Sequence, residues 1–283
     1  MIKLGHNNKL RVGRFVDFGA YLTDDEGAEI LLPARYVSDD LAVGDEIDVF
    51  VYKDSEDRPV ATTDVPYVEV GQFAFLQVVA VNKVGAFLDW GLPKDLLVPF
   101  SEQKARMQQG GIYLVYVYLD NESGRIVASA KVEKYLGNLI PDYKPGQRVE
   151  ALVWEHTPIG YKVIVDNLFQ GMLYQNELYR PVEIEETVDA YVKMVRADGK
   201  IDLTLGDKAV NRVRELSDEI MERLKNSGGS LPYGDKSSPD DIKAEFKCSK
   251  RDFKQAIGRL YKEHRIVIDG DNIALAEKPS DGD

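Results

Sequence analysis

Aromatic residues that recur in three parts of the chain are the side chains best suited to bind a ligand. They are Phe18 and Tyr21, then Phe87 and Trp90, then Tyr161 and Tyr174. An exposed aromatic ring can stack on a nucleobase, and a nearby lysine or arginine can neutralise a phosphate. The alternative is that some of these rings point inward and pack in a hydrophobic core. Both interpretations remain open from the residues alone.

The sequence lacks the residue patterns of known catalytic and metal sites. It has a single cysteine, Cys248, and its histidines, His6, His156 and His264, are not spaced as metal ligands. No glycine-rich loop with a lysine occurs that could hold phosphates. We therefore expect a protein that is not an enzyme and uses no metal or cofactor. The lone cysteine and the lack of a long apolar segment predict a cytoplasmic protein that does not contact membranes.

An internal repeat positions the aromatic residues. Residues 19–22, Gly-Ala-Tyr-Leu, recur 66 residues later as Gly-Ala-Phe-Leu at 85–88, and Gly160 marks a third copy 75 residues after Gly85. Each copy has the short alternating runs of β-strands, with a turn after the third run. Five strands in about 60 residues are typical of an OB-type barrel. A glycine at the start of the second strand permits the bend that closes such a barrel.

The chain after residue 205 has helical periodicity instead. Ser238 and Ser249 each precede a predicted helix as its N-cap. Two short apolar runs, 266–268 and 273–275, flank a turn and predict a two-stranded wing. Three helices followed by a wing indicate a winged-helix domain. The apolar residues of the first predicted helix are Val210, Val213, Leu216, Ile220 and Leu224.

The predicted fold class is multidomain and mainly β. It consists of three tandem five-stranded OB-fold barrels followed by an α+β winged-helix domain. We expect the domains at residues 1–65, 66–137, 138–205 and 206–276, with a disordered tail at 277–283.

The strings around the repeated glycines resemble a known domain and a known family. The strings lie at 18–22 with 31–33, and at 85–88 with 97–99. They are similar to the ribosomal S1 domain. The longer string at 83–99 resembles more closely the conserved virulence factor B family, whose members join three S1-type domains to a winged helix. Over residues 10–275, this resemblance implies S1-type barrels, single-stranded RNA as the partner, and a role in post-transcriptional or virulence gene regulation.

The S1 resemblance also implies which residues contact RNA: two aromatics around the glycine, then an acid and a base at the last hairpin. The candidates are Phe18 and Tyr21 in the first barrel, Phe87, Asp120 and Arg125 in the second, and Tyr161, Lys162, Tyr174, Lys193 and Lys200 in the third. Lys162 stands where an aromatic is expected, and Pro33, Pro99 and Tyr174 stand where S1 domains have a histidine. Each barrel departs from the pattern, so we expect several weak contacts acting together.

Net charge argues against a nucleic-acid partner, but the charge is uneven. The whole chain carries −12, and phosphate contacts normally need a basic surface. Residues 8–65 hold 6 basic and 14 acidic side chains, whereas residues 66–137 hold 7 of each. We therefore expect the first barrel to be the weakest RNA binder. It could instead contact a protein partner, which would make the chain an adaptor.

A basic cluster marks the predicted winged helix. Residues 247–265 contain 7 basic side chains and only two acids. Lys250, Arg251 and Lys254 lie near the start of the third helix, where a recognition helix meets a groove or a phosphate. The alternative is a solvated helix face. If the cluster binds DNA, the protein would be a duplex-DNA-binding regulator rather than an RNA binder.

Overall fold

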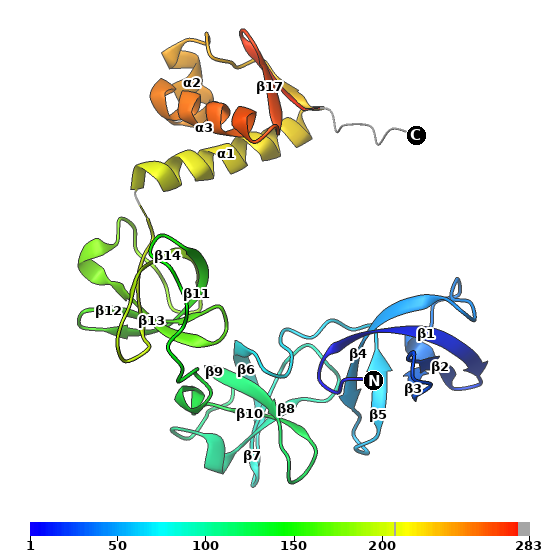
Figure 1. Ribbon diagram of the computed structural model, residues 1–283. Coiled ribbons are helices and arrows are strands. Elements are labelled where there is room, and N and C mark those ends of the chain that lie inside the picture. The colour runs from blue at the N-terminus through cyan, green and yellow to red at the C-terminus, as the bar shows by residue number, and fades with distance from the viewer. Residues whose placement is uncertain (207, 277–283) are drawn as a thin grey trace. The chain divides into compact units, whose positions relative to one another are not determined.

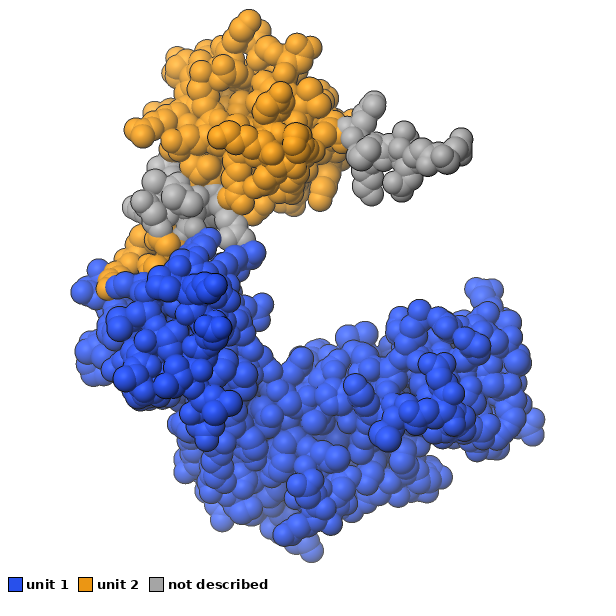
Figure 2. Space-filling view, viewed as in Figure 1, with its two compact units in different colours: residues 1–176, 182–203 blue, residues 177–181, 204–283 orange. Residues whose placement is uncertain are grey.

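The computed structural model describes residues 1–206 and 208–276, which form two compact units (Figure 2). Unit 1 comprises Met1–Asn176 and Val182–Leu203, and unit 2 comprises Glu177–Pro181 and the residues from Thr204 onward. The predicted tail at 277–283 lies outside the described residues. The side chains of residues 208–212, 214 and 215 are also outside them.

The described residues of unit 1 form three closed five-stranded barrels (Figure 1). Barrel 1 contains β1 (Asn7–Val16), β2 (Gly19–Thr23), β3 (Glu29–Pro33), β4 (Glu46–Lys53) and β5 (Pro59–Thr62). Barrel 2 contains β6 (Phe73–Val81), β7 (Gly85–Leu88), β8 (Leu96–Pro99), β9 (Ile112–Leu119) and β10 (Ile126–Ser129). Barrel 3 contains β11 (Arg148–Thr157), β12 (Gly160–Val165), β13 (Phe169–Tyr174), β14 (Thr187–Val195) and β15 (Ile201–Thr204). In each barrel the third strand runs parallel to the fifth, which is the OB topology.

One glycine in each barrel allows the second and third strands to approach closely. Gly85 begins β7 and pairs with Pro99 on β8. A Cβ atom at Gly85 would lie 2.2 Å from the carbonyl oxygen of Val98, which is too close for any other residue. At the equivalent Gly19 and Gly160, such a Cβ would lie 2.1 Å from a carbonyl oxygen. The barrel geometry therefore requires the glycines that mark the repeat in the sequence.

Barrels 1 and 2 share a hydrophobic core at their junction, and barrel 1 also has a separate core of its own. Phe50 and Tyr52 of barrel 1 are buried in the same cluster as Leu88 and Trp90 of barrel 2. The rings of Phe50 and Trp90 meet edge to face, with centroids 5.8 Å apart. Trp90 is 3% exposed, and its Nε1 donates a hydrogen bond to the carbonyl oxygen of Lys94 at 2.6 Å. For this ring the core interpretation is correct, and it does not offer a face to a base.

Barrels 2 and 3 meet through a smaller apolar cluster and one asparagine. Phe73 packs in this cluster with Trp154 and Ile164. The side chain of Asn167 accepts a hydrogen bond from the backbone N–H of Phe73 at 2.8 Å and donates one to the carbonyl oxygen of Gly71 at 2.9 Å. Asn167 has a φ of 56°, a left-handed conformation that asparagine tolerates. The junction thus combines buried rings with two directed hydrogen bonds.

Unit 2 contains a winged helix. Its elements are α1 (Lys208–Asn226), β16 (Ser230–Leu231), α2 (Pro239–Phe246), α3 (Lys250–Lys262), β17 (Ile266–Asp269) and β18 (Asn272–Leu275). Both predicted N-caps are present, since the hydroxyls of Ser238 and Ser249 each accept a backbone hydrogen bond at 3.1 Å. The structure adds a third strand, β16, to the predicted two-stranded wing. The sequence did not predict this strand, because two residues are too few to show a period. The predicted fold class is confirmed.

No helix in the described part of the chain is both long enough and apolar enough to cross a membrane.

Candidate nucleic-acid interface

The outer surface of the second and third strands of barrel 1 forms a groove, which we name groove 1. Tyr21 on β2 lies across from Leu31 on β3, and Leu31 lies beside Val60 on β5. Phe18, in the turn before β2, is 57% exposed, and its ring meets that of Tyr21 edge to face at 6.4 Å. These side chains line a groove of about 890 Å³. The structure thus brings the predicted pair Phe18 and Tyr21 together on one accessible surface.

The charges around groove 1 are already paired. The guanidinium of Arg14 stacks on Tyr21, 4.1 Å from the ring centroid, and pairs with Glu29 at 2.8 Å. Arg58, which lines the groove, pairs with Asp54 at 2.7 Å. A phosphate that approached either arginine would compete with a carboxylate. Groove 1 therefore offers rings to a base in an acidic setting.

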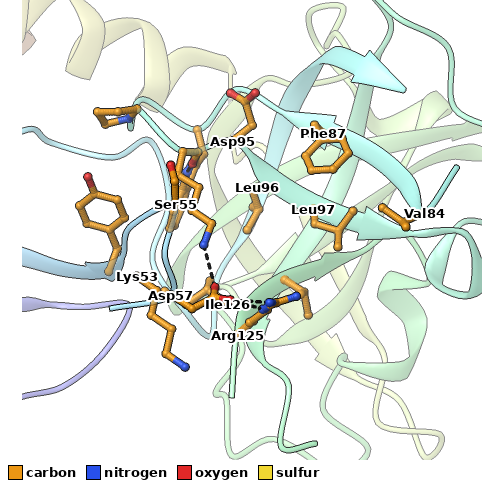
Figure 3. A pocket seen from close by; sticks show the side chains of 15 residues that line it. Lys53, Ser55, Asp57, Val84, Phe87, Asp95, Leu96, Leu97, Arg125 and Ile126 are labelled. Carbon is orange, nitrogen blue, oxygen red and sulfur yellow. Dashed lines mark hydrogen bonds and ion pairs between the residues drawn. The ribbon is translucent and has the colours of Figure 1, made fainter. Parts of the chain in front are cut away.

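Groove 2 is the equivalent surface of barrel 2, with a volume of about 470 Å³ (Figure 3). Phe87 on β7 lies across from Leu97 on β8, at the positions that Tyr21 and Leu31 hold in barrel 1. Val84 replaces the first aromatic, so groove 2 has one ring where groove 1 has two. Figure 3 shows these three apolar side chains grouped together, opposite Lys53, Ser55 and Asp57 of barrel 1. Groove 2 is therefore built by two barrels, not by one.

Three basic side chains reach groove 2, namely Lys53, Lys94 and Arg125. Two of them bind the same carboxylate, that of Asp57 in the hairpin between β4 and β5. Lys94 Nζ lies 3.0 Å from one carboxylate oxygen, while Arg125 donates to the other from Nε at 3.1 Å and from a terminal nitrogen. The hydrogen bonds from Arg125 and Lys94 lower the pKa of Asp57 to about 2. Arg125, a predicted RNA contact, thus lines groove 2, but its guanidinium is already paired with Asp57 of barrel 1.

Asp120 stabilises the turn that carries Arg125, and its side chain does not line groove 2. Its carboxylate accepts hydrogen bonds from the hydroxyl and from the backbone N–H of Ser123, the latter at 3.0 Å. These bonds lower the pKa of Asp120. Its backbone N–H donates to the carbonyl oxygen of Arg125 at 2.8 Å, which closes the hairpin. The structure therefore gives Asp120 a positioning role.

Sequence reasoning missed several cations at groove 2. Lys94 lies just before β8, and a basic residue between the second and third strands could have signalled it. Arg106 stacks its guanidinium 3.7 Å above the ring of Phe100, whose backbone N–H donates to the carbonyl oxygen of Val84 at 3.3 Å. The pair of Arg106 and Phe100 therefore adjoins groove 2. Barrel 1 has Ala34 and Asp40 at the equivalent positions, so the repeat could not reveal this pair.

The corresponding surface of barrel 3 is polar. Lys162 stands at the position of the groove aromatics and pairs with Glu155 at 2.8 Å. Tyr174 lies at the end of β13, and its hydroxyl donates to the carboxylate of Asp202 at 3.2 Å. Both predicted residues thus share one surface, but their polar groups already have partners. Barrel 3 thus has no aromatic ring at the position that Tyr21 and Phe87 hold in barrels 1 and 2.

Three predicted residues of barrel 3 lie away from that surface. Tyr161 is next to Lys162 on β12, and successive side chains of a strand point to opposite faces. Lys193 is exposed on β14, the fourth strand of the barrel. Lys200, in the hairpin before β15, pairs with Asp198 at 3.3 Å. The structure does not gather these three side chains into one site.

In unit 2 the predicted basic residues lie on α3. Arg251 and Lys254 are exposed, and Lys250 is half-buried. Lys254 also lines a shallow groove along the helix together with Lys262. The opposite face of α3 is buried through residues such as Phe253. The exposed face of α3 is thus basic, and one of its cations, Lys254, pairs with Asp235 at 2.8 Å.

Relatives with known names identify the family. The conserved virulence factor B of Staphylococcus aureus (strain USA300) is 30% identical over 247 residues, which cover 85% of this chain and 82% of the relative. The chain belongs to the conserved virulence factor B family. The family protein of Staphylococcus saprophyticus is 27% identical over 266 residues, covering 91% of this chain and 89% of the relative. An uncharacterized protein of Bacillus subtilis (strain 168), YitL, is 29% identical over 272 residues, covering 93% and 90%.

Family models match two kinds of domain in this member of the family. The S1 domain matches residues 4–64 and 70–131, and the CvfB-like winged helix domain matches residues 218–275. S1 barrels and winged helices are nucleic-acid-binding types, and neither model describes a catalytic domain. A crystal structure of a multidomain protein with nucleic acid binding domains from Streptococcus pneumoniae TIGR4 is 25% identical. The matched residues cover 96% of this chain and 98% of the pneumococcal chain, with a TM-score of 0.40.

Proposed function

We propose that this protein binds single-stranded RNA through its S1-type barrels, chiefly along groove 2. The observation that carries the proposal is the arrangement of Phe87 and Leu97 beside Lys94 and Arg125 in one accessible groove. An aromatic ring can stack a base while neighbouring cations hold its phosphates. Such contacts do not read base edges, so binding would tolerate many sequences.

The proposed role is that of a cytoplasmic, non-catalytic regulator. Membership of the conserved virulence factor B family supports action in post-transcriptional or virulence gene regulation. The acidic first barrel would contribute rings but few free cations. We assign the domains to residues 1–65, 66–137, 138–205 and 206–276, since each barrel and the winged helix fall within these limits.

The test is the affinity of the full chain for a labelled single-stranded RNA, measured by fluorescence anisotropy at two salt concentrations. Duplex DNA of the same length serves as competitor. Salt-sensitive binding that duplex DNA does not displace supports the proposal. No binding, or easy displacement by duplex, contradicts it.

Phe87→Ala should weaken single-stranded RNA binding about 5- to 150-fold, because a stacked base contributes about 1–3 kcal/mol. The matched control is Tyr67→Ala, which removes a ring that is 67% exposed but does not line groove 2. The same anisotropy titration measures both variants. Equal losses in the two variants would show that groove 2 is not the binding surface.

The basic face of α3 favours a second candidate, a duplex-DNA-binding regulator. Arg251 and Lys254 are exposed on α3, where recognition helices contact DNA. Replacing both by glutamine should abolish duplex binding if this candidate is correct, and should leave single-stranded RNA binding within about twofold if groove 2 is the main site. Titrations of both nucleic acids against the same variant separate the two functions.

A further inference from the structure

The hairpin of barrel 1 places a carboxylate at a cation pair of barrel 2. Its tip, residues 54–58, is closed by hydrogen bonds to Asp54, whose carboxylate accepts from the backbone N–H of Glu56 at 2.9 Å and of Arg58 at 3.0 Å. Asp57 follows with a φ of 61°, a left-handed conformation. This backbone turns the Asp57 side chain toward groove 2, as Figure 3 shows.

The two cations hold Asp57 as they would hold a phosphate. Each carboxylate oxygen has its own cation, one bound by Lys94 and the other by Arg125. Arginine and lysine form the same charge-assisted hydrogen bonds with phosphate oxygens. The three side chains are 36%, 34% and 54% exposed, for Asp57, Lys94 and Arg125 respectively. An anion from solution can therefore reach them without unfolding of either barrel.

We propose that the Asp57 carboxylate stands in for an RNA phosphate, and that a backbone phosphate of bound single-stranded RNA displaces it from Lys94 and Arg125. The site is thus a phosphate site that the free protein keeps closed with its own carboxylate. This inference rests on the proposed binding of single-stranded RNA along groove 2. It goes further in naming the phosphate contact and its internal competitor.

The exchange is confined to the hairpin tip. Tyr52 and Val60, on the strands that carry the tip, are buried in the core that barrels 1 and 2 share. The carboxylate therefore stays tethered close to the cation pair, at a high effective concentration, after it is displaced. A single free phosphate competes poorly with such a tethered group. A strand that also stacks a base on Phe87 competes well, because its contacts are linked.

The test uses Asp57→Asn in the full chain. Asparagine tolerates the left-handed backbone and keeps the size of the side chain, so the hairpin should retain its shape. We expect single-stranded RNA to bind on the order of tenfold more tightly, because the two cations lose their internal anion. The matched control is Glu56→Gln, which removes the same charge one residue away. Glu56 is 71% exposed, pairs with Arg58 and does not line groove 2.

A second experiment tests whether the gain in RNA affinity depends on the cation pair of Lys94 and Arg125. Arg125→Gln should change RNA affinity less than about twofold in the wild-type background, where Asp57 already neutralises this arginine. In the Asp57→Asn background the same change should cancel most of the gain. Circular dichroism melts of each variant verify that the barrels remain folded.

The outcomes separate this inference from the proposed function. Tighter binding by Asp57→Asn but not by Glu56→Gln, relative to a wild type that binds RNA measurably, supports the inference. If the wild type binds RNA and Asp57→Asn binds equally or less tightly, the inference is wrong and the proposed function stands. Equal gains in both variants also overturn the inference, because they show an effect of net charge alone. If no variant binds RNA, both are overturned.

Discussion

Two residues after each repeated glycine, one side chain decides what the barrel surface can bind. Tyr21 and Phe87 present rings there, whereas Lys162 presents a charge that Glu155 already pairs. The glycine itself cannot vary, because the two strands approach too closely at that point. A conserved backbone geometry therefore carries different surface chemistry in the three barrels.

Gly85→Ala should destabilise the protein by about 2–3 kcal/mol, because the new Cβ must push against the backbone of Val98 and Pro99. Gly258→Ala is the control, since a Cβ there meets no atom within 4 Å. That substitution lies inside α3 and should stabilise the winged helix by about 0.5–1 kcal/mol. Urea unfolding followed by circular dichroism measures both. A neutral Gly85→Ala would contradict the strand geometry described above.

Periodicity predicted local structure well, and contacts between barrels poorly. The repeat of Gly19, Gly85 and Gly160 located the second strands, and the capping serines located α2 and α3, because these signals depend on neighbouring residues. The pairing of Asp57 with Arg125 joins residues 68 positions apart in different barrels. Such a contact depends on how the barrels dock, which no local period encodes. The burial of Trp90 also depends on this docking, so the local pattern does not decide it.

The hairpin between β4 and β5 is the element that connects fold and function. One end of it contributes Tyr52 and Val60 to the shared core, and its tip carries Asp57 into groove 2. Barrel 1 is therefore a structural part of the groove on barrel 2, even though its own surface is acidic. Docking of the two barrels determines which cations are available to a ligand.

Acid should remove the contribution of this hairpin contact to stability. The pKa of Asp57 is about 2 in the folded protein, below its ordinary value of about 3.9. A lowered pKa means that the contact stabilises the fold above about pH 4 and is lost as the pH falls toward 2. The difference in melting temperature between wild type and Asp57→Asn should be constant above about pH 5 and fall steeply toward pH 2, where half of the Asp57 carboxyl groups are protonated. A difference at pH 2 as large as that at pH 5 would contradict the ion pair.

At the scale of the whole molecule, a net charge of −12 must be compatible with binding a polyanion. Groove 2 resolves this locally, because Lys53 of barrel 1 gathers there with Lys94, Arg125 and the adjoining Arg106 of barrel 2. The acidic residues elsewhere on the protein repel the phosphates of any nucleic acid that does not fit the groove. Affinity would therefore come from a short segment of RNA.

The salt dependence of RNA binding should consequently be modest. Contacts with two to four phosphates predict a slope of log K against log salt of about −1.4 to −2.8, from roughly −0.7 per phosphate of a single strand. Anisotropy titrations over a series of potassium chloride concentrations give this slope. A much steeper slope would show that the strand follows a longer basic track, extending beyond groove 2.

The chain has two tryptophans, and each lies at one of the two junctions between barrels. Trp90 is buried where barrels 1 and 2 meet and also lines groove 2, while Trp154 packs where barrels 2 and 3 meet. The unlabelled protein therefore contains one intrinsic optical probe for each junction. In a Trp154→Phe variant, all indole emission comes from Trp90, and a shift in that emission when RNA is added would report directly on groove 2.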